Sequence, residues 1–454
     1  MKVYFLNINN DYPNQYPPIG LLSLAAVCEE KGHEVFLYDL GAKNANYEEF
    51  IYEFCSIQPD VICCSVYTTN FLMTLSVLDH LKKIKSNLII IVGGPHVSAL
   101  PGSLVKNYSF INYEVIGEGE ESLIDLLGGI IIPSSIKGIV YRESFGSIAM
   151  TEKRERIKDL RELPLPKIDL IKRFIYSRDK FSMGKRVGAI ITSRGCPYNC
   201  TFCNKAVFGN TYTRKSTGSV IAEILNQIEV LGIDEINFVD DLFCTDKKWI
   251  NNFISLLRCY NIKLPWKCTG RVNSLDEYYY EKIKQAGCFM IQFGVETGDE
   301  TILKSIKKRI KHHEVESTIA ACKRVGLNTA TYYIIGHPGE THTTAKKTID
   351  FAKHINTDVA HFFVLVPFPG TENYNLVDPE LRDDWSRIRY YHNYGLPISL
   401  CEISPEELKK YELSAKISYY SRILFLKNCF RKPYKLSLIK ISAFVWFTLK
   451  RVFK

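Results

Sequence analysis

The residues with the clearest chemical character are three cysteines, Cys196, Cys200 and Cys203, within the stretch "TSRGCPYNCTFCNKA" (192–206). Tetrahedral zinc sites usually draw on two separated pairs of ligands, and no second C-x-x-C or histidine pair at zinc spacing is obvious in the sequence. A disulfide would leave one of the three thiols over. A cubane iron–sulfur cluster needs four iron ligands, so three cysteines would leave one iron open to a small chelating molecule.

These cysteines follow the first strand of a repeating pattern that runs from 186 to 370. Apolar strand runs alternate there with amphipathic runs, and we expect helices at 217–231, 246–258, 276–286, 313–325 and 342–355. About six strand–helix units are too few for the eight of a closed (β/α) barrel, so the pattern predicts a partial, TIM-like barrel of parallel strands. Chemistry in such folds takes place at the carboxyl ends of the strands, where the cysteines are expected.

The first 130 residues alternate apolar strand runs with helical runs, which predicts a parallel sheet covered by helices on both faces. Doubly wound, Rossmann-like sheets of this type bind ligands at the carboxyl ends of their strands. In this chain those ends carry "GGPH" (93–96), "GEGE" (117–120) and the small polar run 65–69. Turn formation alone would also explain the glycines, so both interpretations stay open.

Length and composition indicate a multidomain globular α/β protein. At 454 residues the chain is too long for one ordinary core, and 46% hydrophobic with 24% charged residues argues against disorder. We expect domains at 1–130, 186–375 and 376–454, with a hairpin around Phe145 and Gly146 and a proline-broken linker within 131–185. No signal peptide is visible, so we expect a cytoplasmic protein whose cysteine cluster binds metal rather than forming disulfides.

The end of the chain has a composition of its own. From Lys427 onward there are eight Lys or Arg residues and no Asp or Glu, interleaved with the apolar run "LSLIKISAFVWFTL". That run is too short and too interrupted to span a bilayer. It predicts either a helix lying on an anionic membrane surface or a helix that caps the barrel with a solvated basic face.

With Phe202 before its last cysteine and a strand before it, the triplet resembles the signature of the radical S-adenosylmethionine (SAM) enzymes. In that family the three cysteines hold a 4Fe–4S cluster whose fourth iron binds the amino and carboxylate groups of SAM. Further matches end the later strands: "FVDD" (238–241), "CTGRVN" (268–273), "FGVETG" (293–298), "IIGHPGE" (334–340) and "PFPGTE" (367–372). The SAM-binding residues that this resemblance implies are Phe202, Asp240, Asp241, Arg271, Glu296, Gly336 and Gly339.

The resemblance also implies a role for each residue. Asp240 and Asp241 would hold the amino end of SAM, and Arg271 would pair with its carboxylate through a charge-assisted contact. Glu296 would lie near the ribose or the amino group, and Gly336 and Gly339 would let the backbone approach the adenine. Taken singly, each acidic or basic residue could equally be a helix cap or a member of an ion pair.

The N-terminal region resembles the cobalamin-binding domain that precedes the barrel in one large subgroup of these enzymes. The matching stretches are "YPPIGLLSLAA" (16–26), "VGGPHVSALP" (92–101) and "VIGEGEESL" (115–123). The cobalamin-binding residues implied are Ser65, Thr68, Gly93, Gly94, Gly117, Glu118 and Gly119. The cobalt-ligating D-x-H-x-x-G motif is absent, since Asp79 and His80 are adjacent within a predicted helix. Cobalamin would therefore bind base-off without a histidine ligand, and we expect a loop-structural role for His96.

These resemblances imply a cobalamin-dependent radical SAM enzyme that reductively cleaves SAM and functionalises an unactivated carbon, and our first hypothesis is a C-methyltransferase. A cyclase or oxidoreductase with the same cofactors, and a non-catalytic cobalamin or cluster sensor, are the alternatives. A transfer-RNA methylthiotransferase is disfavoured, because no second cysteine trio is evident in the N-terminal region. The expected partners are a small-molecule or lipid-linked substrate and a flavodoxin- or ferredoxin-type electron donor, with peripheral contact at the inner membrane surface through the tail and no nucleic acid.

Overall fold

The computed structural model describes residues 1–8, 16–129, 132–178, 181–389 and 395–422. The chain divides into two compact units. The first comprises the described residues of 1–197, 203–241 and 368–374, and the second comprises those of 198–202, 242–367 and 375–422. The main sheet of the first unit has seven strands in the order β2-β1-β3-β4-β5-β6-β7. Their bounds are β1 Lys2–Asn7, β2 Glu34–Asp39, β3 Val61–Ser65, β4 Ile89–Gly93, β5 Tyr113–Val115, β6 Ile139–Arg142 and β7 Ile148–Met150.

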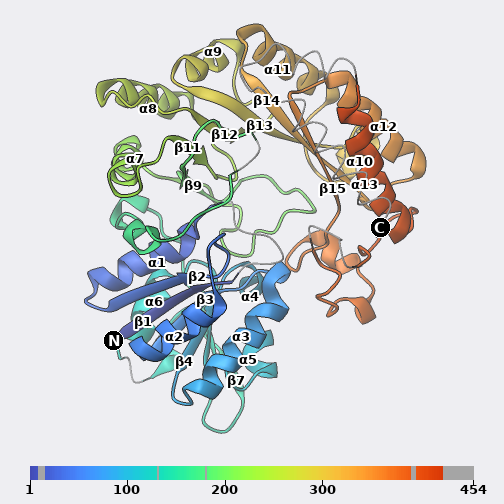
Figure 1. Ribbon diagram of the computed structural model, residues 1–454. Helices are drawn as coiled ribbons and strands as arrows, with labels where there is room; N and C mark the ends of the chain where they lie inside the picture. Colours follow the sequence, from blue (N-terminus) through green and yellow to red (C-terminus); the bar gives the residue numbers. More distant parts are fainter. Residues whose placement is uncertain (9–15, 130–131, 179–180, 390–394, 423–454) are drawn as a thin grey trace. The chain divides into compact units, whose positions relative to one another are not determined.

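Strands β1 to β5 pair in parallel, as the apolar strand runs predict. The helices that accompany them are α1 Ile19–Glu30, α2 Tyr47–Ile57, α3 Phe71–Ile84, α4 Pro95–Ala99, α5 Ser103–Asn107 and α6 Glu120–Leu127. Helix α1 packs against α6. Because strand-to-strand crossovers are right-handed, α2 and α3 cover the opposite face of the sheet from α1 (Figure 1). The doubly wound architecture is therefore confirmed.

The hairpin predicted around Phe145 and Gly146 forms from β6 and β7. Gly146 has a φ of +90°, a conformation that favours glycine, and the Glu143 amide donates to the Ser147 carbonyl at 2.9 Å. Strand β6 also pairs antiparallel with β5, so the hairpin extends the first sheet. The domain boundaries expected from the sequence are not tested by this pairing and stay a prediction.

The strands after residue 186 form a second sheet in the order β15-β14-β13-β12-β11-β8, which confirms the six predicted strands. Their bounds are β8 Val187–Ile190 and β11 Glu235–Phe238 in the first unit, and β12 Trp266–Gly270, β13 Cys288–Glu296, β14 Asn328–Ile335 and β15 Val359–Val364 in the second. The pairs β8–β11, β12–β13, β13–β14 and β14–β15 are all parallel. A short antiparallel pair, β9 Ser193–Arg194 and β10 Thr213–Arg214, encloses the cysteine loop.

Helix α7 Thr217–Leu231 lies in the first unit, and the other helices of this region lie in the second. They are α8 Lys247–Cys259, α9 Glu277–Gln285, α10 Glu300–Ser305, α11 His312–Val325, α12 His342–Ile355 and α13 Pro405–Tyr420. Within the second unit, α8, α9, α11 and α12 follow one another, each packing against the next (Figure 1). Helix α13 packs against α12 and against the edge strand β15.

The five expected helices agree with the structure to within one residue at each end. Four of the five N-termini follow from side-chain capping, because Ser216, Asp246, Asp276 and Thr341 each accept a hydrogen bond from the first turn. Helix α10 has no counterpart among the expected helices, since six residues are too few to show a helical period. Short 3₁₀ helices lie at Thr68–Asn70, Pro133–Ser135, Leu160–Glu162, Ile168–Ile171, Glu372–Leu376 and Pro379–Leu381.

Within the described ranges, every helix is too short or too polar to cross a membrane. The basic, apolar tail from Lys427 onward lies outside the described residues, so its predicted role at a membrane surface or on the barrel stays a prediction.

Candidate functional site

The cysteine loop begins after β8 and β9. Cys196 and Cys200 are partly exposed and Cys203 is exposed, whereas Cys244, Cys268, Cys288 and Cys322 are buried. Gly195 precedes the first cysteine with a φ of +81°, and a Cβ there would collide with the Thr211 carbonyl oxygen. No group of three His, Cys, Asp or Glu side chains in the described part of the chain is arranged to hold a metal ion. The three thiols are accessible and close in sequence, and their ligation of the cluster stays a prediction from the motif.

Asp240 connects the end of β11 to the start of the cysteine loop. Its buried Oδ1 accepts hydrogen bonds from the Thr192 amide at 3.0 Å and the Thr192 hydroxyl at 2.8 Å, and also from the Ser193 hydroxyl. Burial raises the pKa of the Asp240 carboxyl, and these hydrogen bonds oppose the shift. Asp241 is exposed. The contact of either residue with the amino end of SAM stays a prediction.

Three of the predicted SAM-binding residues meet one segment of the second unit. The buried Glu296, at the end of β13, accepts a hydrogen bond from Lys308 Nζ at 2.6 Å. The Arg271 guanidinium donates to the carbonyl oxygens of Lys308 and Arg309. It also lies 3.6 Å from the centre of the Tyr198 ring, in the cysteine loop. Lys308 Nζ lies 6.0 Å from the centre of the Phe202 ring. Arg271, Glu296 and Phe202 are therefore brought around Lys308.

The loop after β14 contributes the second group in this unit. Gly336 and Gly339 have φ values of +103° and +81°, so both require glycine. Glu340 Oε2 accepts hydrogen bonds from the amides of Gly336 at 2.5 Å and His337 at 3.1 Å. Burial raises the pKa of Glu340 to about 7.

His337 is fully buried in the same loop, and its ring centre lies 5.5 Å from that of Phe202. Burial, with a smaller effect from Lys308, lowers the pKa of His337 to about 3, so its imidazole is neutral. Neither ring nitrogen of His337 has a hydrogen-bond partner among the described residues. Buried polar atoms without partners are costly, so these nitrogens suit a polar ligand such as SAM.

Two residues at this site, Lys308 and His337, are absent from the sequence-based set. Lys308 lies in the basic run "KSIKKRIKHH" (304–313), which shows no strand or motif by itself. His337 stands next to Gly336 in "GHPGE", so the motif could have pointed to it.

The predicted cobalamin residues lie at the carboxyl ends of β3, β4 and β5. Ser65 and Gly93 are register partners, and Gly94 has a φ of +95°. A Cβ on Gly94 would lie 2.5 Å from Ser65 Oγ, so a side chain there would fill the space between these strand ends. Gly117 also has a positive φ, of +79°. Glycines and small polar residues at these strand ends would allow a large ring such as that of cobalamin to approach the backbone closely.

His96 is buried at the start of α4. Its Nδ1 forms a hydrogen bond with the Thr68 hydroxyl at 3.0 Å, and its ring centre lies 4.5 Å from that of Phe71. Burial lowers the pKa of His96 to about 4. This packing supports the expected loop-structural role. Asp79 and His80 both lie within α3, as expected.

Glu118 belongs to a buried cluster of opposite charges in the first unit. Its Oε1 accepts from Arg194 Nη1 at 2.8 Å, and its Oε2 accepts from the Ile157 amide at 2.8 Å. Arg194 Nη2 donates to Glu120 at 2.6 Å. Both carboxylate oxygens of Glu118 thus already accept hydrogen bonds from the protein. A contact between Glu118 and cobalamin would have to use the same two oxygens. Gly119 has an ordinary negative φ and packs against Leu24.

Comparison with known proteins finds two family models that match separate parts of the chain. A model of the B12-binding domain matches residues 7–127, and a model of the radical SAM superfamily matches residues 190–352. An uncharacterized methyltransferase of Pyrococcus horikoshii is 30% identical over 413 residues, which cover 89% of this chain and 88% of the relative. The anaerobic magnesium-protoporphyrin IX monomethyl ester cyclase of Rubrivivax gelatinosus is 22% identical, over 95% of this chain and 78% of the cyclase.

A solved structure shows the same fold. The radical SAM methyltransferase TsrM of Kitasatospora setae, with cobalamin and a 4Fe–4S cluster bound, matches with a TM-score of 0.68 at 19% identity, over 90% of this chain and 84% of TsrM. A doubly wound domain followed by a six-stranded partial barrel with a cysteine triplet defines the class of radical SAM enzymes that carry a cobalamin-binding domain. The chain belongs to this family. Its cofactors are accordingly a 4Fe–4S cluster, SAM and cobalamin.

Proposed function

We propose that this protein transfers a methyl group from SAM to an unactivated carbon of its substrate. The observation that carries this proposal is the relative named a methyltransferase, which is 30% identical and matches the chain across both domains. The likeness to a cyclase at 22% identity favours ring closure with the same cofactors as the second candidate. A sensor without catalysis is less well supported, because all three cysteines are accessible and three of the predicted SAM-binding residues, Arg271, Glu296 and Phe202, lie around Lys308.

The side chains of this protein would bind and orient the cofactors. When bound, the cofactors supply one-electron chemistry and a transferable methyl group. Cys196, Cys200 and Cys203 would hold three irons. Arg271 and Glu296 would meet the polar groups of SAM, with Phe202 beside them. The backbone at Gly336 and Gly339 would face the adenine, and Ser65, Thr68 and the glycine-lined strand ends of the first unit would accommodate cobalamin.

For the substrate and the electron donor we propose only a chemical class. Radical SAM enzymes act on substrates with electrons from an external reductant, and we propose a flavodoxin- or ferredoxin-type donor. A small molecule or a lipid-linked molecule is the proposed substrate. Membrane contact through the basic tail would favour the lipid-linked one, and it also stays a proposal.

The test uses SAM with a deuterated methyl group. The reconstituted holoenzyme is incubated anaerobically with this SAM, a low-potential reductant and the lipid or the water-soluble fraction of a metabolite extract. Mass spectrometry should then find 5′-deoxyadenosine and a product that carries the labelled methyl group. The fraction in which the product appears tells the lipid-linked substrate from the soluble one.

Two variants serve as controls. Cys200→Ala should keep its fold by circular dichroism but form no 5′-deoxyadenosine, because one iron would lose its ligand. Cys259→Ala replaces an exposed cysteine on α8 and should behave as wild type. Substrate conversion without the methyl label would favour the cyclase, and SAM cleavage by Cys200→Ala would overturn the cluster assignment.

A further inference from the structure

The connection between α10 and α11, residues 306–311, is the part of the second unit on which the predicted SAM site converges. The Thr201 amide, between Cys200 and Phe202, donates to the Ile306 carbonyl at 3.1 Å. The Arg271 guanidinium donates to the carbonyls of Lys308 and, at 3.1 Å, Arg309. Lys308 Nζ pairs with Glu296. The cysteine loop and the ends of two strands are thus bound to three residues of this connection, Ile306, Lys308 and Arg309.

The backbone of this connection is held in an unusual conformation. Lys307 and Arg309, on either side of Lys308, have φ values of +57° and +54°. Non-glycine residues rarely adopt the left-handed region, and such conformations persist only where surrounding contacts impose them. Both flanking side chains are exposed, whereas only 12% of the Lys308 side chain is. The connection therefore directs one of three consecutive basic residues to the site.

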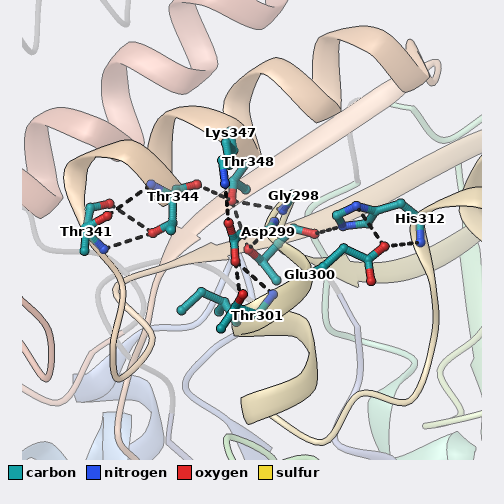
Figure 2. A network of polar contacts seen from close by, with 11 residues as sticks. Gly298, Asp299, Glu300, Thr301, His312, Thr341, Thr344, Lys347 and Thr348 are labelled. Carbon is teal, nitrogen blue, oxygen red and sulfur yellow. Dashed lines mark hydrogen bonds and ion pairs between the residues drawn. The ribbon is translucent and has the colours of Figure 1, made fainter.

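Both ends of the α10–α11 segment are anchored, as Figure 2 shows. At the start, Asp299 caps α10 by accepting from the Thr301 amide at 2.9 Å and pairs with Lys347 of α12 at 2.8 Å. At the end, the His312 amide donates to Glu300 Oε1 at 3.2 Å, and its ring Nε2 lies 3.3 Å from the Thr297 carbonyl oxygen. With both ends anchored, the connection has little freedom to move away from Glu296.

The ion pair between Lys308 and Glu296 is almost completely shielded from solvent. Only 6% of the Glu296 side chain is exposed. A Cβ on Gly294 would lie 2.7 Å from Lys308 Nζ and would collide with Glu296 Oε1, so the glycine leaves the room that the pair occupies. A buried carboxylate without its cation is strongly destabilised. Lys308 is thus the cation that pairs with the Glu296 carboxylate and holds it in place.

We propose that Lys308 is a positioning residue of the SAM site, which orients Glu296 through its ammonium group and Arg271 through its backbone carbonyl. The proposal rests on the SAM-binding roles proposed for those two residues. Lys308 acts through them, so its removal should weaken SAM binding while the cluster cysteines keep their iron.

The test measures the SAM dissociation constant of anaerobically reconstituted holoenzyme by equilibrium dialysis. Lys308→Met, which keeps the length of the side chain and removes its charge, should bind SAM about 10- to 100-fold more weakly. Lys308→Arg should restore affinity to within about threefold of wild type, because the charge returns. Lys304→Met, which removes an exposed lysine from α10, should leave affinity unchanged. Iron and cobalamin contents should be equal in all variants.

A spectroscopic measurement separates positioning from loss of fold. SAM should alter the electron paramagnetic resonance signal of the reduced wild-type cluster, and Lys308→Met should need a higher SAM concentration for the same change. If Lys308→Met does not fold, the double variant Glu296→Gln, Lys308→Met removes both charges. The double variant should bind SAM as weakly as Glu296→Gln.

Wild-type affinity in a folded Lys308→Met protein, or in the double variant, would overturn the proposal. If the wild-type protein binds SAM and the Lys308 variants bind it equally well, the role of Lys308 is wrong but the proposed function still stands. A wild-type protein that binds no SAM would overturn both.

Discussion

At the scale of single residues, Glu340 is a buried acid whose ionisation is linked to folding. Its ordinary pKa is 4.5, and burial raises the pKa to about 7 in the folded state. The folded protein therefore holds this proton more tightly than the unfolded chain. The resulting stabilisation is fully present below about pH 4.5 and is lost as the pH rises through about 7.

We expect Glu340→Gln to remove this pH dependence, because the amide oxygen still accepts from the Gly336 and His337 amides but carries no charge. Between about pH 5.5 and pH 8.5 the wild type should lose about 2 kcal/mol more stability than the variant. Thermal unfolding of the apoprotein at several pH values measures this difference. Glu229→Gln, at an exposed position of α7, is the matched control. Parallel pH profiles for the wild type and Glu340→Gln would contradict the prediction.

At the scale of elements, the turn after β13 is held closely against α12. Thr348 Oγ1 lies 3.0 Å from the Gly298 amide nitrogen (Figure 2). It also lies 3.0 Å from Thr297 Oγ1. A Cβ on Gly298 would lie 2.5 Å from the Lys347 carbonyl oxygen and 2.7 Å from Thr348 Cα. These are backbone atoms of a helix, which cannot move aside cheaply.

Gly298→Ala should therefore lower the free energy of unfolding by about 1–3 kcal/mol, the cost of overpacking. The matched control is Gly218→Ala in the first turn of α7, where nothing lies within 3.4 Å of the added Cβ. That change should stabilise the protein by about 0.5–1 kcal/mol, because alanine favours the helix. Denaturant unfolding of the two variants measures both effects. A Gly298→Ala protein as stable as the wild type would show that the turn can accommodate the added methyl group.

At the scale of the whole chain, the buried cluster around Arg194 ties distant stretches of the first unit together. Arg194 stands two residues before Cys196, and its partners Glu118 and Glu120 belong to the "GEGE" stretch of the cobalamin-binding domain. Arg156 also pairs with Glu118, at 3.4 Å. The start of the cysteine loop is thus anchored to the loop predicted to face cobalamin.

Arg194→Met should destabilise the protein by about 3–5 kcal/mol, because it leaves two buried carboxylates short of a cation. Arg194→Lys should recover part of this loss, since the charge returns but the two-pronged geometry does not. Lys158→Met, which breaks an exposed ion pair with Glu155, should leave stability unchanged. Thermal unfolding of the three variants gives the comparison, and a stable Arg194→Met protein would mean that water or Arg156 compensates for the lost cation.

Much of the fold follows from local patterns in the sequence. The expected helices agree to within one residue because apolar period and capping residues such as Asp246 and Thr341 act over only a few positions. The pairing of the β6–β7 hairpin with β5 was not expected, because its strands show the same alternation whether or not another strand lies beside them. Lys308 was missed for a similar reason: nothing near it in the sequence marks the carboxylate of Glu296 as its partner.

The sequence by itself determined the cysteine triplet, the order of strands and helices, and the glycines at the strand ends, because each depends on residue type and short-range spacing. It also determined the family through motifs that recur at successive strands. Only the tertiary structure decided which charges meet: Lys308 with Glu296, and Arg194 with Glu118 and Glu120. Burial makes such pairings energetically important, and burial is a property of the folded chain, since it depends on residues that lie far apart in the sequence.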